Sequence, residues 1–429
     1  MSIVELEKSR TLTAKGWRGT NLDRSYTIEK RSYDQSMLGV ACMSTSPDGN
    51  CGIVKTMPLE PRITNARGYV DIVENVDDLK DANIFSPGEL LTTQSARSDD
   101  SIRTAMALKQ SKHVIPIKKA VPVLISNGAD EAVRYSLSSD FCVNADEDGE
   151  VIEMNPDTEV MVVKYKSGNI RAINLQNHIV KNGAGGFYLN NKLSTNLKVG
   201  DKFKANQALA WHDKFFNRTK SSGVCLNMGA LEKIAVMATY NNYQDGCFIT
   251  HKLSDDTAAD LLFQESGVIG KNATLDYILN VGDKVDTGDI ICSYNTSYNE
   301  TELNKFLDSL SGDLKDEINE NSRQVIKAHH SGIIEDIKVY STVDLDDMSP
   351  SLRKYVSKYY KKVKTLRDQL NKYDSSNSVY KCGILLNEPT GKVEPNKFGV
   401  LKGHKIEDGI LIEIYIRHTD IMGIGDKLA

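Results

Sequence analysis

The stretch IEIYIRHTDIMGIGDKLA, residues 412–429, joins a run of Ile and Tyr residues to a turn signal, the Gly425-Asp426 pair. The same Gly-Asp turn occurs twice upstream within the sequence VGDK, at residues 199–202 and 281–284. An apolar pair follows each upstream copy at the same offset. Glycine allows a tight turn that residues with a Cβ resist, and the apolar pair closes a short hairpin. The repeat predicts hairpins of the kind found in small intertwined barrels; a common hairpin type without function is the alternative for each copy alone.

Length and composition indicate a globular protein of several domains. Of the 429 residues, 40% are hydrophobic and 26% are charged, and no long uncharged apolar run predicts a membrane helix. The N-terminus does not resemble a secretory signal, so we expect a cytoplasmic protein. Seven scattered cysteines without a C-x-x-C pair favour free thiols in a reducing compartment. The net charge of −5 is unlike that of an independent nucleic-acid binder, so any such contact must be local.

Short runs of Tyr, Val and Ile between turn signals predict mostly β structure. The clearest helix is predicted over residues 351–373, after the start signal Ser349-Pro350. Its apolar residues form a heptad seam, which predicts a helical partner. Its other faces are basic, and are either a solvated surface or a docking surface for another protein or for nucleic acid. The seam comprises Leu352, Val356, Tyr359, Val363, Leu366 and Leu370, and the basic residues are Arg353, Lys354, Lys358, Lys361, Lys362, Lys364 and Arg367.

No motif of a self-contained active site occurs: the sequence has no G-x-S-x-G, no P-loop and no His pair with metal-ligand spacing. Asp100 and Arg103 lie about one helical turn apart, so they either pair with each other or hold a phosphate. Four segments stand out together. We call them the first to fourth motifs: CMSTSPDGNCGIVK at residues 42–55, with Arg31 and Gly39 before it; DDSIR at 99–103, running to Pro116; LNMGALEKIAVMATYNNYQDGCFIT at 226–250; and residues 412–429.

These motifs resemble the β (second-largest) subunit of multisubunit DNA-dependent RNA polymerases. The first is similar to R…G…C-P-x-E-T-P-E-G-x-x-C-G-L-V-K, the second to D-D-A-N-R, the third to the segment that ends G-Y-N-F-E-D-S-I-x-I-S, and the fourth to the strand and turn before G-D-K-M-A-G-R-H-G-N-K-G. Order and approximate spacing are kept across nearly the whole chain. The divergent motifs favour the split form of giant bacteriophages (phiKZ-like).

The resemblance implies a mixed α/β, β-rich, multidomain fragment. We expect a fork and hybrid-binding region at residues 1–125, and hybrid-binding and double-psi β-barrel segments at 126–300. A flap-like domain with a helical insert is expected at 301–405. Residues 406–429 would begin the C-terminal barrel and its GDK motif, which the sequence truncates.

The resemblance also implies roles in nucleotide addition. Arg103, with Asp100, would contact the incoming triphosphate, and Lys427 would neutralise phosphate near the RNA 3′ end. Asp245 and Gln244 occupy the family's E-D position beside the second magnesium. Glutamine in place of glutamate removes a negative charge there, which puts direct metal coordination in doubt.

The same resemblance assigns Arg31 and Lys55 to the segment that lines the fork and the RNA–DNA hybrid. It implies that magnesium is bound mainly by three aspartates of a partner β′ subunit, so this chain alone holds no metal and is inactive alone.

The partners implied are β′-type polymerase subunits, the remaining β fragments (an N-terminal piece and a C-terminal piece that starts after GDKLA), the DNA template, RNA, ribonucleoside triphosphates and a specificity factor, with no membrane. We expect the host cytoplasm as its location, with the virion as the alternative.

Two other classes of function are left open. One is a non-enzymatic phage structural or interaction protein that retains polymerase-like barrels. The other is a carrier protein with lipoyl-like hairpins, suggested by the VGDK repeat; it lacks the expected lysine flanked by Asp and Met at a hairpin tip.

Overall fold

The structure is a computed structural model of the chain, and it describes residues 10–15, 26–42, 49–91, 115–181, 186–219, 223–237, 240, 246–296, 323–374, 390–394 and 408–426. These residues form many strands and few helices, so the predicted mixed, β-rich fold is confirmed at this level. The short 3-10 helices are Ile28–Lys30, Gln35–Met37, Val76–Asp78, Val133–Tyr135 and Leu345–Asp347.

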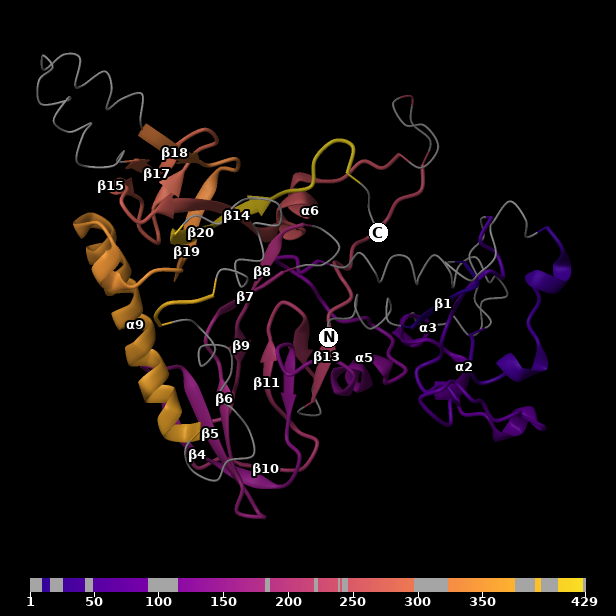
Figure 1. Ribbon diagram of the computed structural model, residues 1–429. Helices are drawn as coiled ribbons and strands as arrows, with labels where there is room; N and C mark the ends of the chain where they lie inside the picture. Colours follow the sequence, from indigo (N-terminus) through magenta and orange to yellow (C-terminus); the bar gives the residue numbers. More distant parts are fainter. Residues whose placement is uncertain are drawn as a thin grey trace, which may run out of the picture.

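The N-terminal residues form a small module that lies to one side of the main body of strands (Figure 1). Strand β1 (Thr11–Thr13) pairs antiparallel with β2 (Val54–Thr56). The short helices α2 (Asp81–Ile84) and α3 (Pro87–Leu91) follow. Buried Leu91 then packs into the same apolar cluster as Val133 and Trp211, and so connects the module to the middle of the chain.

The middle of the chain folds into small antiparallel sheets around two apolar clusters, one that contains Met161, Val163 and Leu209 and one that contains Trp211 and Phe216. One sheet has the strand order β10-β4-β5-β6 and another the order β3-β11-β9, while β12 pairs with β13. The bounds are β3 Cys142–Asn144, β4 Gly149–Asn155, β5 Val160–Tyr165, β6 Ile170–Asn174, β9 Leu193–Ser194, β10 Lys202–Phe203, β11 Ala208–His212, β12 Phe216–Arg218 and β13 Val224–Leu226, with helix α5 at Ala129–Ala132.

The largest sheet is organised around two long strands that lie far apart in sequence. Strand β14 (Ala259–Gly270) pairs antiparallel with β20 (Gly409–Asp420) from Ala259↔Asp420 to Gly270↔Gly409, and β19 (Gly332–Ser341) pairs with the other edge of β20. Isoleucines of β20 are completely buried, since both neighbours and the apolar cluster cover them. The full order is β16-β19-β20-β14-β8-β7, with β7 at His178–Lys181, β8 at Tyr188–Asn191 and β16 at Lys284–Val285.

A three-stranded sheet in the order β15-β17-β18 lies next to the largest one. Its strands are β15 (Thr274–Ile278), β17 (Ile290–Asn295) and β18 (Arg323–Lys327). The boundary expected at residue 300 therefore falls between two strands that pair with each other. The division into domains, and the barrel and flap names, stay predictions.

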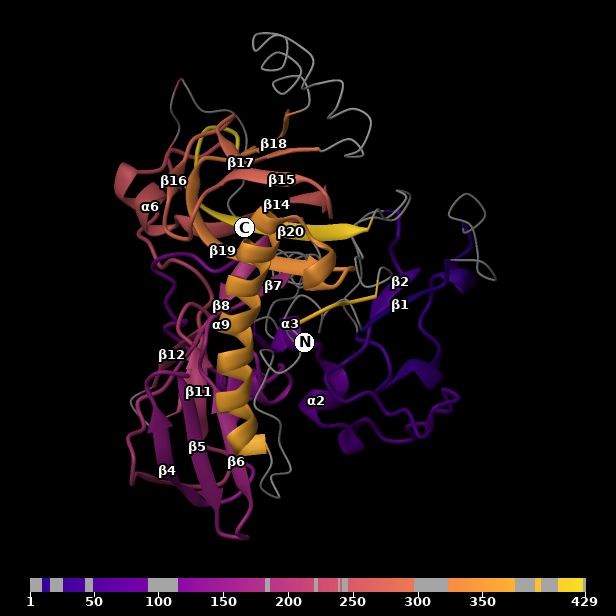
Figure 2. The same ribbon diagram turned by 60° about the vertical axis from the view of Figure 1, so that its left-hand side comes forward.

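Helix α9 (Pro350–Asp374) confirms the predicted long helix and runs alongside the strands from β15 down toward β6 (Figure 2). The heptad seam predicted a helical partner, and this is wrong for the first half of the helix. There Leu352 and Val356 are completely buried in the apolar cluster of β17, β19 and β20. An apolar stripe needs an apolar surface, and a sheet face supplies one as well as a helix does. No helix within the described residues is long and apolar enough to cross a membrane.

The repeated Gly-Asp turn has one geometry at all three sites. Gly200, Gly282 and Gly425 have φ of 89°, 97° and 94°, the left-handed region that favours glycine. In each copy the aspartate carboxylate accepts a hydrogen bond from the backbone N–H three residues earlier, at 2.8, 2.7 and 2.7 Å. A further copy, with Gly288 and Asp289, has the same bond at 2.8 Å. The turn that the sequence predicts is therefore a recurrent building unit of the fold.

Candidate functional site

The segment that follows the second motif lies against the start of the third. The backbone N–H of Val121 donates to the carbonyl of Gly229 at 2.8 Å, and the N–H of Met228 donates back to Val121 at 3.0 Å. This isolated bridge pins residue 121, which lies shortly after the second motif, beside the first residues of the third.

The same segment also contacts the residues that follow the third motif. Helix α6 (His251–Asp256) begins at Thr250, whose side chain accepts from the backbone N–H of Leu253 and caps the helix. Lys119 donates its backbone N–H to the carbonyl of Asp256 at 3.0 Å, and its Nζ lies 2.5 Å from the Asp256 carboxylate. The hydrogen bond from the Lys119 side chain is the largest of the effects that hold the pKa of Asp256 below its usual value.

The fourth motif reaches the same place through strand β20. The hydroxyl of Ser254 in α6 donates to the carbonyl of Met422 at 2.8 Å, and Ala259 pairs with Asp420. The end of β20 and the turn after it therefore lie beside α6 (Figure 1). We call the residues that meet here, 118–121, 228–229, 254–260 and 419–426, the motif junction.

Asp260 links two parts of the chain to the end of β20. Its carboxylate accepts hydrogen bonds from the hydroxyl of Thr419 at 2.8 Å and from Nζ of Lys214 at 3.0 Å. Burial alone would raise the pKa of Asp260, but these two hydrogen bonds and the positive charge of Lys214 outweigh it and lower the pKa. Sequence alone does not predict this contact, because the three residues are far apart along the chain.

Hydrogen bonds of Asp426 close the last described turn. Asp426 accepts from the N–H of Gly423 at 2.7 Å, and its own N–H donates to the carbonyl of Gly423. Lys427 comes directly after this turn in sequence. Lys427 itself lies outside the described residues, as do Asp100, Arg103, Gln244 and Asp245.

Arg31 and Lys55 lie in the N-terminal module, and both contact the described part of the first motif at residues 49–52. The Arg31 guanidinium donates to the carbonyls of Gly49 and Cys51, both at 2.9 Å. The ammonium group of Lys55 lies 4.7 Å from the centre of the Tyr33 ring and donates to the carbonyl of Gly52. Burial lowers the pKa of Lys55. Both side chains therefore help to shape the loop at residues 49–52, a role that the sequence did not predict.

Large apolar side chains are exposed on the third and fourth motifs. Val236 is 99% exposed and Ile424 is 110% exposed. Large apolar side chains that are exposed to solvent are typical of surfaces that another protein covers. Sequence reasoning did not predict this exposure, because both segments were interpreted as parts of known motifs and not as a surface. The exposed residues are Leu231, Ile234, Val236, Met237, Phe248, Ile421 and Ile424.

Among the described residues, no three His, Cys, Asp or Glu side chains are placed to hold a metal ion together. The expectation that a partner subunit binds the magnesium is not tested by this observation and stays a prediction.

No protein-family model matches the chain. The chain is 23% identical to the DNA-directed RNA polymerase subunit beta of Clostridium novyi (strain NT) over 332 residues, which cover 70% of this chain and 26% of that protein. The subunit of the same name from Alkaliphilus oremlandii (strain OhILAs) is 24% identical over 445 residues, covering 83% of this chain and 35% of that protein. The subunit of the same name from Clostridioides difficile (strain 630) is 24% identical over 314 residues, which cover 66% of this chain and 24% of that protein.

The chain thus spans about a quarter to a third of the length of the curated relatives it matches. It is weakly homologous to bacterial RNA polymerase β subunits and is β-subunit-like.

Proposed function

We propose that this chain is part of the β subunit of a multisubunit DNA-directed RNA polymerase of the split, giant-bacteriophage form. Together with β′-type chains it would form the active centre that adds ribonucleoside triphosphates to RNA on a DNA template. The observation that carries this proposal is the motif junction. Segments next to three separate polymerase-like motifs meet there through the Val121–Gly229 bridge, the Lys119–Asp256 ion pair and the Ser254–Met422 hydrogen bond.

Nucleotide addition needs positioning and charge more than covalent chemistry from the protein. Magnesium held mainly by the partner β′ chain would supply the Lewis acid for attack by the RNA 3′ hydroxyl. In this chain Arg103, assisted by Asp100, would hold the triphosphate, since a guanidinium is planar and always charged. Lys427 would neutralise phosphate near the RNA 3′ end, and Asp245 with Gln244 would lie near the second magnesium.

The proposal also extends to the parts of the fold that bind nucleic acid. Arg31 and Lys55 would face the RNA–DNA hybrid, where contacts to the backbone carry no sequence information. Residues around Asp245 and Lys427 would belong to a double-psi β-barrel, and a flap-like domain would include α9. The remaining β fragments, template DNA, RNA and a specificity factor complete the expected assembly, in the host cytoplasm or the virion.

The exposed apolar residues of the third and fourth motifs support the need for partner chains. A surface that includes fully exposed Val236 and Ile424 is unfavourable in water and becomes favourable once a partner buries it. The isolated chain is therefore expected to be inactive, and nucleotide incorporation by the purified chain alone would contradict the proposal.

The test is to isolate the tagged chain from infected or co-expressing cells and to identify its partners by mass spectrometry. We expect a chain with an N-A-D-F-D-G-D-like triad and chains that resemble other segments of the β subunit. Recovery of virion coat components alone would favour the non-enzymatic structural protein instead.

A further inference from the structure

Helix α9 concentrates positive charge in a chain that is acidic as a whole. Eight of its 25 residues are Lys or Arg and two are Asp, whereas the chain carries a net charge of −5. Lys354, Lys358 and Lys362 are exposed and follow one another every four residues, so they form one row on the helix surface. Each step is ~6 Å along the helix axis. The row is therefore an extended line of charge rather than a single anion site.

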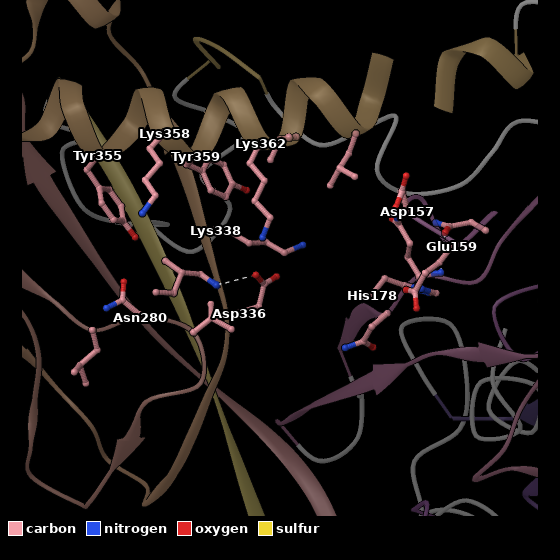
Figure 3. Close-up of a pocket in the computed structure, with 18 of the residues that line it drawn as sticks. Asp157, Glu159, His178, Asn280, Asp336, Lys338, Tyr355, Lys358, Tyr359 and Lys362 are labelled. Carbon is pink, nitrogen blue, oxygen red and sulfur yellow. Dashed lines mark hydrogen bonds between the residues drawn. The ribbon is translucent and has the colours of Figure 1, made fainter. Parts of the chain in front are cut away.

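Two lysines of this row line a pocket of about 870 Å³ between α9, the end of β6 and strand β19. Figure 3 shows Lys358 and Lys362 pointing from the helix into this pocket, toward the side on which Lys338 of β19 lies. Tyr355 and Tyr359 line the same wall, and both rings are half-buried because they also pack against the apolar cluster beneath the helix. We call this wall, with Lys338, Tyr355, Lys358, Tyr359 and Lys362, the α9 groove.

Acidic residues line two sides of the pocket, which restricts where an anion can lie. Asp336 lies on the same strand as Lys338, and the opposite wall is acidic. It carries Asp157 and Glu159, and Figure 3 shows both across the pocket from the lysines. Glu159 is paired with Lys192 at 2.8 Å, so its charge is already compensated. Burial lowers the pKa of His178 on this wall, so the imidazole is neutral at pH 7 and adds no positive charge. The positive potential is therefore greatest along the helix side.

We propose that the α9 groove binds the phosphate backbone of a single-stranded nucleic acid. Lysine side chains in a row attract successive phosphates, and each contact releases condensed counterions. Aromatic rings beside such a row are the usual stacking platforms for unpaired bases. In a duplex the bases are already stacked on each other, so the tyrosines favour a single strand. This contact is independent of the catalytic role proposed above, because none of these residues belongs to the four motifs.

Charge complementarity distinguishes this occupant from a protein. The groove offers lysines at regular spacing with aromatic rings between them, and an unbranched polyanion matches that pattern along its whole length. An acidic protein segment would also be attracted, but it would gain nothing from stacking. Competition between a single-stranded nucleic acid and an acidic peptide therefore shows which of them the α9 groove binds more tightly.

The experiment is a titration of the full-length chain against a fluorescently labelled single-stranded RNA oligonucleotide, followed by anisotropy at several salt concentrations. The test variant is Lys358→Gln with Lys362→Gln. The matched control is Lys361→Gln with Lys364→Gln, which removes the same charge from exposed positions of α9 outside the groove. All four lysines are exposed, so both variants are expected to fold, and circular dichroism checks this.

We expect the groove variant to weaken binding by roughly tenfold and to lower the slope of log K against log salt by about 1.4, since each phosphate contact on a single strand contributes about 0.7. The control variant should bind within about twofold of the unmodified chain, and Asp157→Asn should strengthen binding. Equal losses in the two double variants, equally tight binding of a duplex, or full competition by a polyglutamate peptide would each overturn the proposal. Loss of polymerase activity plays no part in the readout, so failure here leaves the proposed function intact.

Discussion

Gly52 in the first motif is required by its surroundings. Its φ is +69°, and a Cβ placed on it would lie 2.1 Å from the carbonyl oxygen of Arg31. Real Cβ atoms do not approach backbone that closely, so a substitution must move the loop that Arg31 and Lys55 shape. The glycine of the C-G-I-V-K sequence is thus a packing requirement of this loop.

We predict that Gly52→Ala lowers the free energy of unfolding by about 3 kcal/mol, which combines left-handed strain with the steric clash. Chemical denaturation measures it. Gly168→Ala is the matched control: Gly168 also has a positive φ, +91°, but open space around it, so only ~1 kcal/mol is expected. Similar losses in both variants would show that the clash with Arg31 is not real.

Asp260 gives a prediction about pH. Its pKa is lower in the folded chain than in the unfolded chain, so its contribution to stability is fully present above the unfolded value of about 4 and is lost as the pH falls through the folded value. Asp260→Asn should lower the free energy of unfolding by about 0.5–1 kcal/mol at pH 7, a figure discounted for the partial exposure of the pair. The difference between variant and parent should shrink below pH 4. A constant difference from pH 7 to pH 3 would contradict the assigned hydrogen bonds.

The sequence predicted which single residues the motifs require, but not which distant residues form hydrogen bonds with each other. Gly39 and Gly52 could be recognised from the motif, and each proves to be closely packed. The link from Asp260 to Lys214 and Thr419 could not be predicted, since nothing local to these residues specifies the approach of distant strands.

The Gly-Asp turn is the element that the sequence predicted most completely. A glycine with positive φ and an aspartate that accepts a backbone N–H are local requirements, so a short sequence suffices to specify them. The copy with Gly288 and Asp289 was missed because Thr287 precedes it and Ile290 follows it, in place of the apolar residue and the lysine that flank the other copies.

This recurrence allows a controlled test of the turn before Lys427. Asp426→Ala removes the hydrogen bond to Gly423, a local loss of about 1 kcal/mol, and we expect it to reduce RNA extension by the assembled polymerase roughly tenfold. Asp426→Asn keeps an acceptor oxygen and should retain most activity. Asp201→Ala removes the same bond from a turn outside the motif junction and should leave extension unchanged. Equal effects of the alanine changes at positions 426 and 201 would refute a special role for the last turn.

Helix α9 shows what periodicity specifies and what it does not. The stepping of apolar residues predicted both the helix and its buried face, and Leu352, Val356 and Val363 are buried. It could not identify the covering surface, because strands β17, β19 and β20 bury an apolar stripe as effectively as a helix does. The basic face, for which solvated and docking roles were both open, now borders a pocket.

For the whole molecule, the pairing of β14 with β20 determines the arrangement. It joins the segment that follows the third motif to the fourth motif across a long stretch of chain. The resemblance implied that residues of several motifs act in one reaction, but sequence alone could not predict that β19 pairs with the other side of β20. Pairing between strands that are far apart in sequence depends on the complete fold. The motif junction can therefore be recognised only in the three-dimensional structure.

The most direct test of the central claim is template-directed RNA extension by the complex that copurifies with this chain, comparing the unmodified chain with Lys427→Gln. Lys202→Gln is the matched control, because Lys202 also follows a Gly-Asp turn. We predict that the Lys427 variant assembles normally but extends RNA roughly 100-fold more slowly, the scale of losing one transition-state charge contact, while the Lys202 variant is unaffected. Equal extension by all three complexes would contradict the assignment of this chain to a polymerase active centre.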